Sequence, residues 1–90
     1  MNVTFSEALL IERKSTHGDW MIQSEIHDNI IKSLSISSNY DGISASKKMA
    51  LHAIAMKMAR IVCGDPNHKD HWLDIAGYAH LGLGSTGENE

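Results

Sequence analysis

The stretch of sequence that decides the fold is residues 44–63, SASKKMALHAIAMKMARIVC. Ala, Met and Leu are strong helix formers, so the stretch predicts a helix from about Ser44 to Cys63. Apolar side chains occur on almost every side of this helix, which is typical of the middle of a bundle or of an oligomer. Gly64 ends the helix, and Pro66 prevents its continuation. We therefore expect other helices, or further copies of the chain, to surround residues 44–63.

Three further helices are expected before and after this stretch, at about residues 6–16, 19–34 and 68–81. The second of them begins at Asp19, a good N-cap, and its clearest apolar stripe recurs every four residues: Ile22, Ile26, Ile30 and Leu34. The sequence therefore predicts an all-α protein, a compact bundle of about four helices that forms homo-oligomers through its apolar third helix.

Glycine and small polar residues separate or interrupt these helices. Residues 35–42 are rich in Ser, Asn, Asp and Gly, which predicts a mobile loop. Gly77 lies inside the last helix, where it predicts a close helix–helix approach or a ligand against the backbone. We place one helical domain at residues 1–83 and a flexible tail at residues 84–90.

Composition and charge exclude some classes of binding partner for this chain. The chain has 90 residues, of which 42% are hydrophobic, an ordinary composition for a soluble domain. Its longest apolar run is far shorter than the ~20 residues of a membrane helix, so we expect no membrane partner. A formal net charge of −3 disfavours duplex nucleic acid, because that affinity depends on neutralising phosphates. The single cysteine, Cys63, cannot form an internal disulfide and favours a reducing, cytoplasmic location.

The end of the first helix is one candidate ligand site. Arg13 and His17 are four residues apart and share a helix face. The planar guanidinium of Arg13 could hold a phosphate. The alternative is that both cations only complement the negative end of the helix dipole.

The second candidate site combines two cations with two carboxylates. Lys57 and Arg60 lie in apolar surroundings, where a charge is costly unless it has a partner. That partner is either an anionic ligand or a carboxylate of the last helix. Asp70 and Asp74 lie one helical turn apart and need a cation between them, either Mg²⁺ or one of these two basic side chains.

Two aromatic residues accompany these carboxylates. Tyr78 continues the row of Asp70 and Asp74, and Trp72 lies between the two acids in the sequence. Each aromatic side chain either contacts a base or ribose, or belongs to the core or an interface.

Five segments together carry a resemblance: IER at 11–13, THGD at 16–19, KMAR at 57–60, GDP at 64–66 and DHWLDIAGY at 70–78. They resemble a family of small tailed-phage proteins of unassigned function, over about residues 9–83. That family is distantly similar to all-α, MazG-like nucleotide pyrophosphohydrolases. The resemblance implies an oligomeric helical bundle with a nucleotide near the facing helices.

Carried over by position, the resemblance places Lys57 and Arg60 at phosphates and Asp70 and Asp74 at a metal ion. Enzymes of that type hold Mg²⁺ with two acidic pairs on successive helices. Residues 44–63 contain no carboxylate, so Glu25 and Asp28 would have to supply the second pair.

Three hypotheses follow, and we favour the first. It is a non-catalytic nucleotide binder that sequesters an immune signal, of cyclic-nucleotide or ADP-ribose type, as an anti-defence sponge in the host cytoplasm. Its expected ligand contacts are Arg13, His17, Lys57, Arg60, Trp72 and Tyr78. The second is an Mg²⁺-dependent nucleotide pyrophosphohydrolase. The third is an oligomeric structural protein in which the cations and carboxylates form only internal ion pairs.

Overall fold

The computed structural model describes residues 5–84, which form four α-helices and one short 3-10 helix. These are α1 (Phe5–His17), α2 (Trp20–Leu34), η1 (Tyr40–Gly42), α3 (Ala45–Cys63) and α4 (Lys69–Leu83). No strand occurs within the described residues. The prediction of an all-α protein with four helices is confirmed. Of the predicted tail, Gly84 is the C-cap of α4, and residues 85–90 lie outside the described part of the chain.

Capping residues determine where the helices α2 and α3 begin. The carboxylate of Asp19 accepts hydrogen bonds from the backbone N–H groups of Met21 and Ile22, at 2.9 and 3.2 Å, and so starts α2. The hydroxyl of Ser44 accepts from the backbone N–H of Lys47 and starts α3. These local signals explain why the helix ends predicted from the sequence agree with the structure to within two residues.

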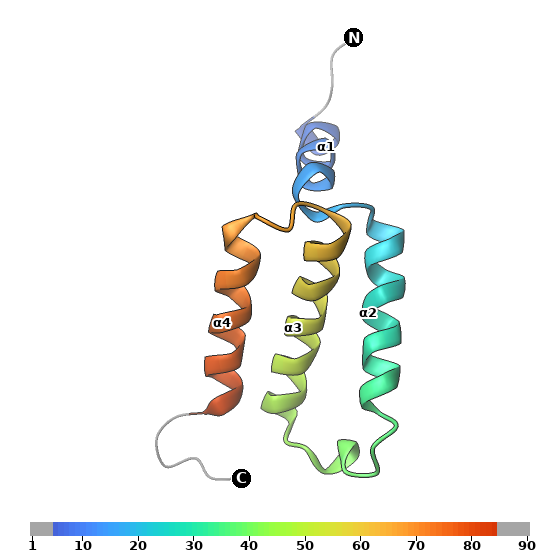
Figure 1. The fold of residues 1–90 in the computed structure, drawn as a ribbon, viewed down its shortest axis with the longest axis vertical. Helices are drawn as coiled ribbons and strands as arrows, with labels where there is room; N and C mark the ends of the chain where they lie inside the picture. Colours follow the sequence, from blue (N-terminus) through green and yellow to red (C-terminus); the bar gives the residue numbers. More distant parts are fainter. Residues whose placement is uncertain (1–4, 85–90) are drawn as a thin grey trace.

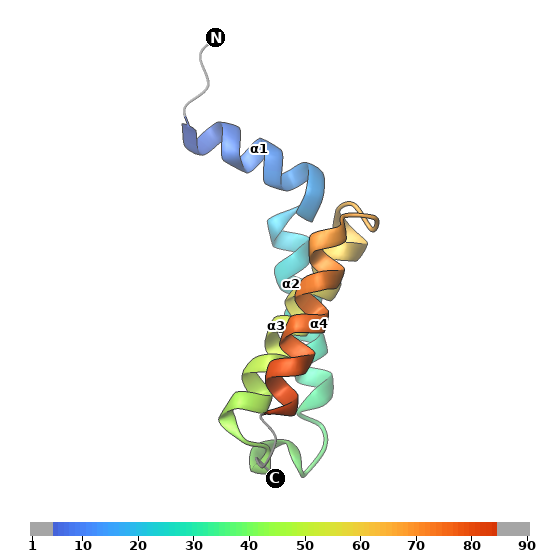
Figure 2. The same ribbon diagram turned by 90° about the vertical axis from the view of Figure 1, so that its left-hand side faces the viewer.

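Helices α2, α3 and α4 lie side by side in one layer, with α3 in the middle (Figure 1). Seen from its edge, the layer is one helix thick, and α1 leaves it at one end (Figure 2). Helix α1 packs against the layer through α3. The central position expected for residues 44–63 is therefore observed, but the helices around them form an open layer.

The apolar core between these helices is thin. Its buried members are Ala50, Ala55, Ala59 and Ile61, all on α3. Three of the four are alanines, whose small side chains let neighbouring helices approach closely but bury little apolar area. Most of the larger apolar side chains consequently remain on the surface of the layer.

The close approach between α3 and α4 occurs at Gly82. A Cβ atom there would lie 2.9 Å from the Cβ of Ala50, and the ammonium of Lys47 donates to the Gly82 carbonyl at 2.6 Å. The sequence suggested Gly77 for such a contact, but a Cβ at Gly77 would meet no atom within 4 Å. The close-packing interpretation of Gly77 is therefore wrong, and Gly82 has that role.

The connection from α2 to α3 is tied to the layer. It contains η1, where the Tyr40 hydroxyl lies 3.0 Å from Nε2 of His52 on α3. The ammonium of Lys48 lies 5.1 Å from the centre of the Tyr40 ring, a cation–π contact. The segment predicted as a mobile loop thus has specific contacts with α3. No helix within residues 5–84 has the length and hydropathy needed to cross a bilayer.

Candidate functional site

Two glycine turns cross at the end of the layer where α1 joins it. Gly18 has a φ of +84°, and a Cβ added there would overlap the carbonyl group of Cys63. A Cβ added to Gly64 would overlap the carbonyl group of Thr16. Only glycine fits at either point, because the two backbones touch. The crossing fixes the end of α1 against the end of α3.

Three hydrogen bonds hold this crossing. The backbone N–H of Asp65 and a ring N–H of His71 both donate to the Thr16 carbonyl, each at 3.0 Å. The amide of Gln23 donates to the Gly18 carbonyl, also at 3.0 Å. The His71 side chain is 1% exposed, so its ring is a structural part of the junction.

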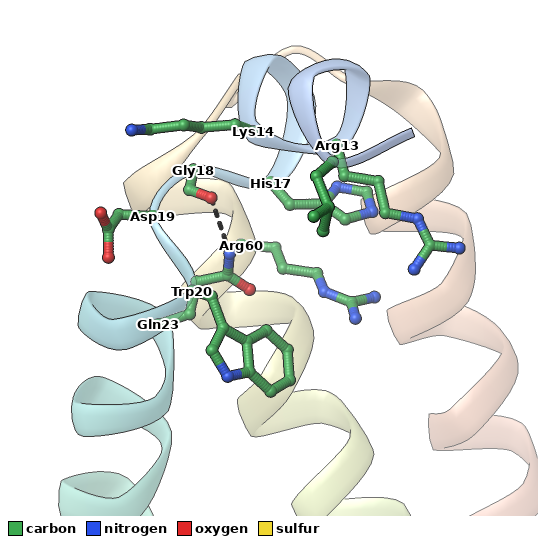
Figure 3. A pocket seen from close by; sticks show the side chains of 9 residues that line it. Arg13, Lys14, His17, Gly18, Asp19, Trp20, Gln23 and Arg60 are labelled. Carbon is green, nitrogen blue, oxygen red and sulfur yellow. Dashed lines mark hydrogen bonds between the residues drawn. The ribbon is translucent and has the colours of Figure 1, made fainter. Parts of the chain in front are cut away.

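A cavity of about 260 Å³ lies beside the crossing, between the end of α1, the start of α2 and the last turn of α3. Its lining residues are Leu10, Arg13, Lys14, His17, Gly18, Asp19, Trp20, Gln23 and Arg60. Figure 3 shows the side chains of Arg13 and Arg60 extending toward the same side of the cavity, with the Trp20 indole nearby. The side chains of Lys14 and Asp19 point the other way (Figure 3).

The cations Lys57 and Arg60 have different environments. The ammonium of Lys57 lies 2.9 Å from Oδ2 of Asp74, and this ion pair lowers the pKa of the Asp74 carboxyl below its usual value. The Nε atom of Arg60 is buried and has no hydrogen-bond partner among the described residues. The sequence left open whether these two cations pair with a ligand or with a carboxylate of the last helix. In the structure Lys57 pairs with a carboxylate, and the Nε of Arg60 has no partner among the described residues.

The pKa of His17 reflects the burial and the positive charge around the cavity. Burial, followed by the charge of Arg60, lowers the pKa of His17 to about 4. His71 and Lys57 contribute to the same shift, and the Thr16 hydroxyl lies 3.0 Å from Nδ1 of His17. His17 is consequently neutral at pH 7, in a site where added positive charge is unfavourable and an anion is favoured.

The structure brings three of the predicted ligand residues together: Arg13, His17 and Arg60 line the same cavity. It places Trp72 elsewhere. Trp72 and Asp74 are two residues apart on α4, about 200° around the helix, so they point to opposite sides of the layer. The Trp72 indole N–H donates to the Pro66 carbonyl at 2.8 Å.

Tyr78 and Asp74 line one shallow depression on α4, as their spacing predicts. Asp70 is exposed, 3.8 Å from the His68 ring. No group of three or more His, Cys, Asp or Glu side chains within residues 5–84 is arranged to hold a metal ion. Binding of Mg²⁺ by Asp70 and Asp74 stays a prediction.

Sequence reasoning missed Trp20 and Gln23 as cavity residues. The apolar stripe and the polar face of an amphipathic helix account for a Trp and a Gln at these positions without any ligand. A signal was present, because Trp20 directly follows the His17–Asp19 turn and therefore begins the helix that leaves the crossing. Two Gly-Asp turns in one short chain, at residues 18–19 and 64–65, were the other sign that these segments meet.

The fold and cavity define a small all-α domain with a cationic cavity at one end of a three-helix layer. A family model described as a domain of unknown function (DUF6378) matches residues 3–85, and the chain therefore belongs to this family. No curated protein and no solved structure matches the chain.

Proposed function

We propose that the protein binds a nucleotide-type phosphate ligand in the cavity between α1, α2 and α3, and holds it without chemical change. The observation that carries this proposal is the buried, unpartnered Nε of Arg60 in the wall of that cavity. A buried polar group without a partner is costly, and a guanidinium pairs strongly with phosphate oxygens. A bound phosphate would supply the missing acceptor.

The other lining residues suit the same ligand. Arg13 adds a second guanidinium on the side of Arg60 (Figure 3), and two such groups can grip a diester or a diphosphate. The exposed Trp20 indole offers a flat surface on which a base can stack. A cavity of about 260 Å³ is smaller than most sites for drug-sized ligands. We therefore infer that one phosphate lies inside it and the base lies over Trp20.

The positions of the carboxylates favour binding over hydrolysis. Asp74 is already engaged by Lys57, and Asp28 forms an exposed ion pair with Lys32 one turn further along α2. Helices α2 and α4 flank α3 on opposite sides (Figure 1), so the acidic pair Glu25 and Asp28 is separated from the acids of α4. This arrangement does not form the double acidic site that a MazG-like enzyme uses for Mg²⁺.

The biological setting of the proposal rests on the resemblance to small tailed-phage proteins. A protein of that kind would act stoichiometrically in the host cytoplasm, by sequestering a nucleotide signal of bacterial immunity. The cyclic di- and trinucleotides and the ADP-ribose isomers share the phosphates and bases that this cavity suits. The role is then that of an anti-defence sponge.

A thermal-shift screen of the full chain tests the proposal. The probes are nucleoside triphosphates, cyclic di- and trinucleotides and cyclic ADP-ribose isomers, each with Mg²⁺ and with EDTA. A ligand at 100 times its Kd adds about 2.7 kcal/mol, a shift of several degrees for a small domain. We expect a shift that persists in EDTA, with the ligand recovered intact by chromatography. Hydrolysed ligand that requires Mg²⁺ would support the enzyme hypothesis instead, and no shift with any probe would contradict the proposal.

A matched pair of variants locates the site. Arg13→Gln removes a guanidinium directed toward Arg60, whereas Lys14→Gln removes a neighbouring cation whose side chain points away (Figure 3). We expect a loss of about tenfold or more in affinity for Arg13→Gln, because a charge-assisted hydrogen bond is lost, and little change for Lys14→Gln. Equal losses in both variants would mean that net charge, and not this cavity, attracts the ligand.

A further inference from the structure

A second hollow lies beside the cavity of Arg13 and Arg60, between α2 and α3. Its volume is about 130 Å³, and its lining residues are Trp20, Gln23, Ser24, His27, Met56 and Ala59. Two of these residues, Trp20 and Gln23, also line the cavity of Arg60. The two spaces therefore share one wall, and a ligand held in the first is within reach of the second.

Helix geometry explains this shared wall. Residues 20, 23, 24 and 27 of α2 are three or four positions apart, so their side chains lie along one face of the helix. On α3, Ala59 lines the second hollow and the next residue, Arg60, lines the first. From Trp20 to His27 the helix rises about 10 Å, which is comparable to the length of one nucleotide.

The amide of Gln23 presents an acceptor in this wall. The Gln23 side chain is 5% exposed, so its polar atoms depend on partners within the site. Its nitrogen donates to the Gly18 carbonyl at 3.0 Å. Its oxygen, Oε1, accepts no hydrogen bond from the described residues, and it lies on the side of Trp20 and Arg60, away from Gly18 (Figure 3). A ligand with an N–H or O–H group would satisfy this acceptor.

The other two polar side chains of the second hollow also present acceptors. The Ser24 hydroxyl donates to the Met21 carbonyl at 2.8 Å, which leaves the lone pairs of its oxygen. Nε2 of His27 lies 3.2 Å from the His52 carbonyl, and because a carbonyl only accepts, this nitrogen carries the proton. In the neutral ring Nδ1 is then an acceptor. Of the donors on the three side chains, only the second amide hydrogen of Gln23 remains.

This lining determines which part of a nucleotide fits the second hollow. None of its six residues is Lys, Arg, Asp or Glu, so a phosphate would have no counter-charge there. The side chains of Trp20, Met56 and Ala59 supply flat and apolar surface for a base. An exocyclic amino group offers two N–H donors to the acceptors, whereas a keto oxygen in its place would face other lone pairs.

We propose that the second hollow is a base subsite that takes a nucleobase with an exocyclic amino group, while the phosphate of the same nucleotide lies against Arg13 and Arg60. The subsite rests on the proposed function, since one ligand occupies both spaces. The Trp20 indole stacks on the base, and Gln23 and Ser24 accept from its amino group. The protein therefore prefers amino-bearing nucleotides to nucleotides of the same shape without that group.

Pairs of probes that differ only by an amino group in place of hydrogen test the proposal on the unmodified full chain. The pairs are ATP with purine riboside triphosphate, GTP with ITP, CTP with pyrimidin-2-one riboside triphosphate, and cyclic di-GMP with cyclic di-IMP. By titration calorimetry in EDTA, we expect the amino-bearing member of at least one pair to bind about tenfold or more tightly.

The two proposals fail in different ways in this experiment. Nucleotides that bind with equal affinity within every pair would overturn the base subsite and leave the proposed function standing. The absence of binding by every nucleotide would overturn both.

A matched pair of variants locates the subsite. Ser24 and Asn29 are both exposed, polar and uncharged residues of α2, but only Ser24 lines the second hollow. Ser24→Leu fills the hollow, so the amino-bearing nucleotide should lose about tenfold in affinity and its preference over its partner probe. Asn29→Leu should keep the parent affinity and preference. A parent-like Ser24→Leu would overturn the subsite, and the probe pairs on the parent chain decide the question even if this variant fails to fold.

Discussion

Two sides of α3 carry nearly the same apolar residue types, and we call the side of Arg60 the Arg60 face and the side of Leu51 the apolar face. Along the Arg60 face the row reads Met49, Met56, Arg60, and along the apolar face it reads Leu51, Met58, Val62. One row ends in a guanidinium with an unpartnered nitrogen beside a cavity, and the other has no charge at all. The difference teaches that exposed apolar surface alone does not define a function here. The two rows differ by one cation, Arg60, whose buried Nε has no partner among the described residues.

The largest expected effect concerns the glycine crossing that holds α1 on the Arg60 face. Gly64→Ala places a Cβ against the Thr16 carbonyl and should lower the free energy of unfolding by about 2–3 kcal/mol or more. Gly77→Ala is the matched control, because open space surrounds that position; it should raise stability by about 0.5–1 kcal/mol. Urea unfolding measures both. A neutral Gly64→Ala would show that the two turns do not touch.

The next prediction compares the stability of variants at two cations, Lys57 with its carboxylate partner and Arg60 with its unpartnered Nε. Arg60→Met removes a buried nitrogen that lacks a partner, so the ligand-free protein should gain about 1 kcal/mol of stability while losing its phosphate affinity. Lys57→Met leaves Asp74 without its ion pair and should lower the melting temperature only slightly, because water screens the exposed Asp74 carboxylate. Thermal unfolding with and without a bound nucleotide compares them. If both variants are equally destabilised, Arg60 is a structural cation and the scaffold hypothesis gains support.

A pH-dependent effect follows from the low pKa of His17. That pKa is about 4 in the folded chain and about 6.5 in the unfolded chain, so the unfolded state binds more protons between these values. The stability is fully present above about pH 6.5 and falls as the pH is lowered toward 4. His17→Gln should therefore lose less stability than the parent over this range.

Nuclear magnetic resonance of the His17 ring checks this directly. Its titration midpoint should lie near pH 4 without ligand and rise when a phosphate anion occupies the cavity, since the anion offsets the charge of Arg60. An ordinary midpoint near 6.5 in the free protein would mean that the cavity is neither desolvated nor positive.

The smallest effect is expected on the outer side of α2, away from both faces. Asp28→Asn breaks an exposed ion pair with Lys32 and should leave the melting temperature almost unchanged, because water and salt screen both charges. Ligand affinity should stay at the parent value. Loss of a nucleotide-hydrolysing activity in this variant would instead return Asp28 to the acidic site of the enzyme hypothesis.

Local chemistry explains which parts of the fold could be predicted. The capping residues Asp19 and Ser44, and the helix-ending Gly64, act on their own neighbours in the chain, so the sequence locates the helix ends. Which glycine packs closely was not predictable in this way. Gly77 and Gly82 are both helical glycines of α4, and only the register against Ala50 decides that Gly82 is the tight one.

The candidate site also has one part that local spacing predicts and another part that depends on how the helices pack. The spacing of Arg13 and His17 predicted a shared face, and both residues line the cavity. Trp72 does not line this cavity, because it lies near the predicted carboxylates in sequence, whereas Trp20 lies near Arg60 in space. A ligand contact by Trp72 stays a prediction. Sequence proximity is a poor guide once a helix turns two neighbours about 200° apart.

The sequence by itself determined an all-α chain with an apolar central helix, because helix propensity, caps and hydrophobic periodicity are local properties. Only the tertiary structure decided the partners of the two cations. Lys57 meets Asp74 across the α3–α4 contact, whereas Arg60, one turn later, meets the cavity wall. The physical reason is that a charge is satisfied by what lies within a few ångströms of it. That neighbourhood depends on how separate helices are placed, which no local pattern specifies.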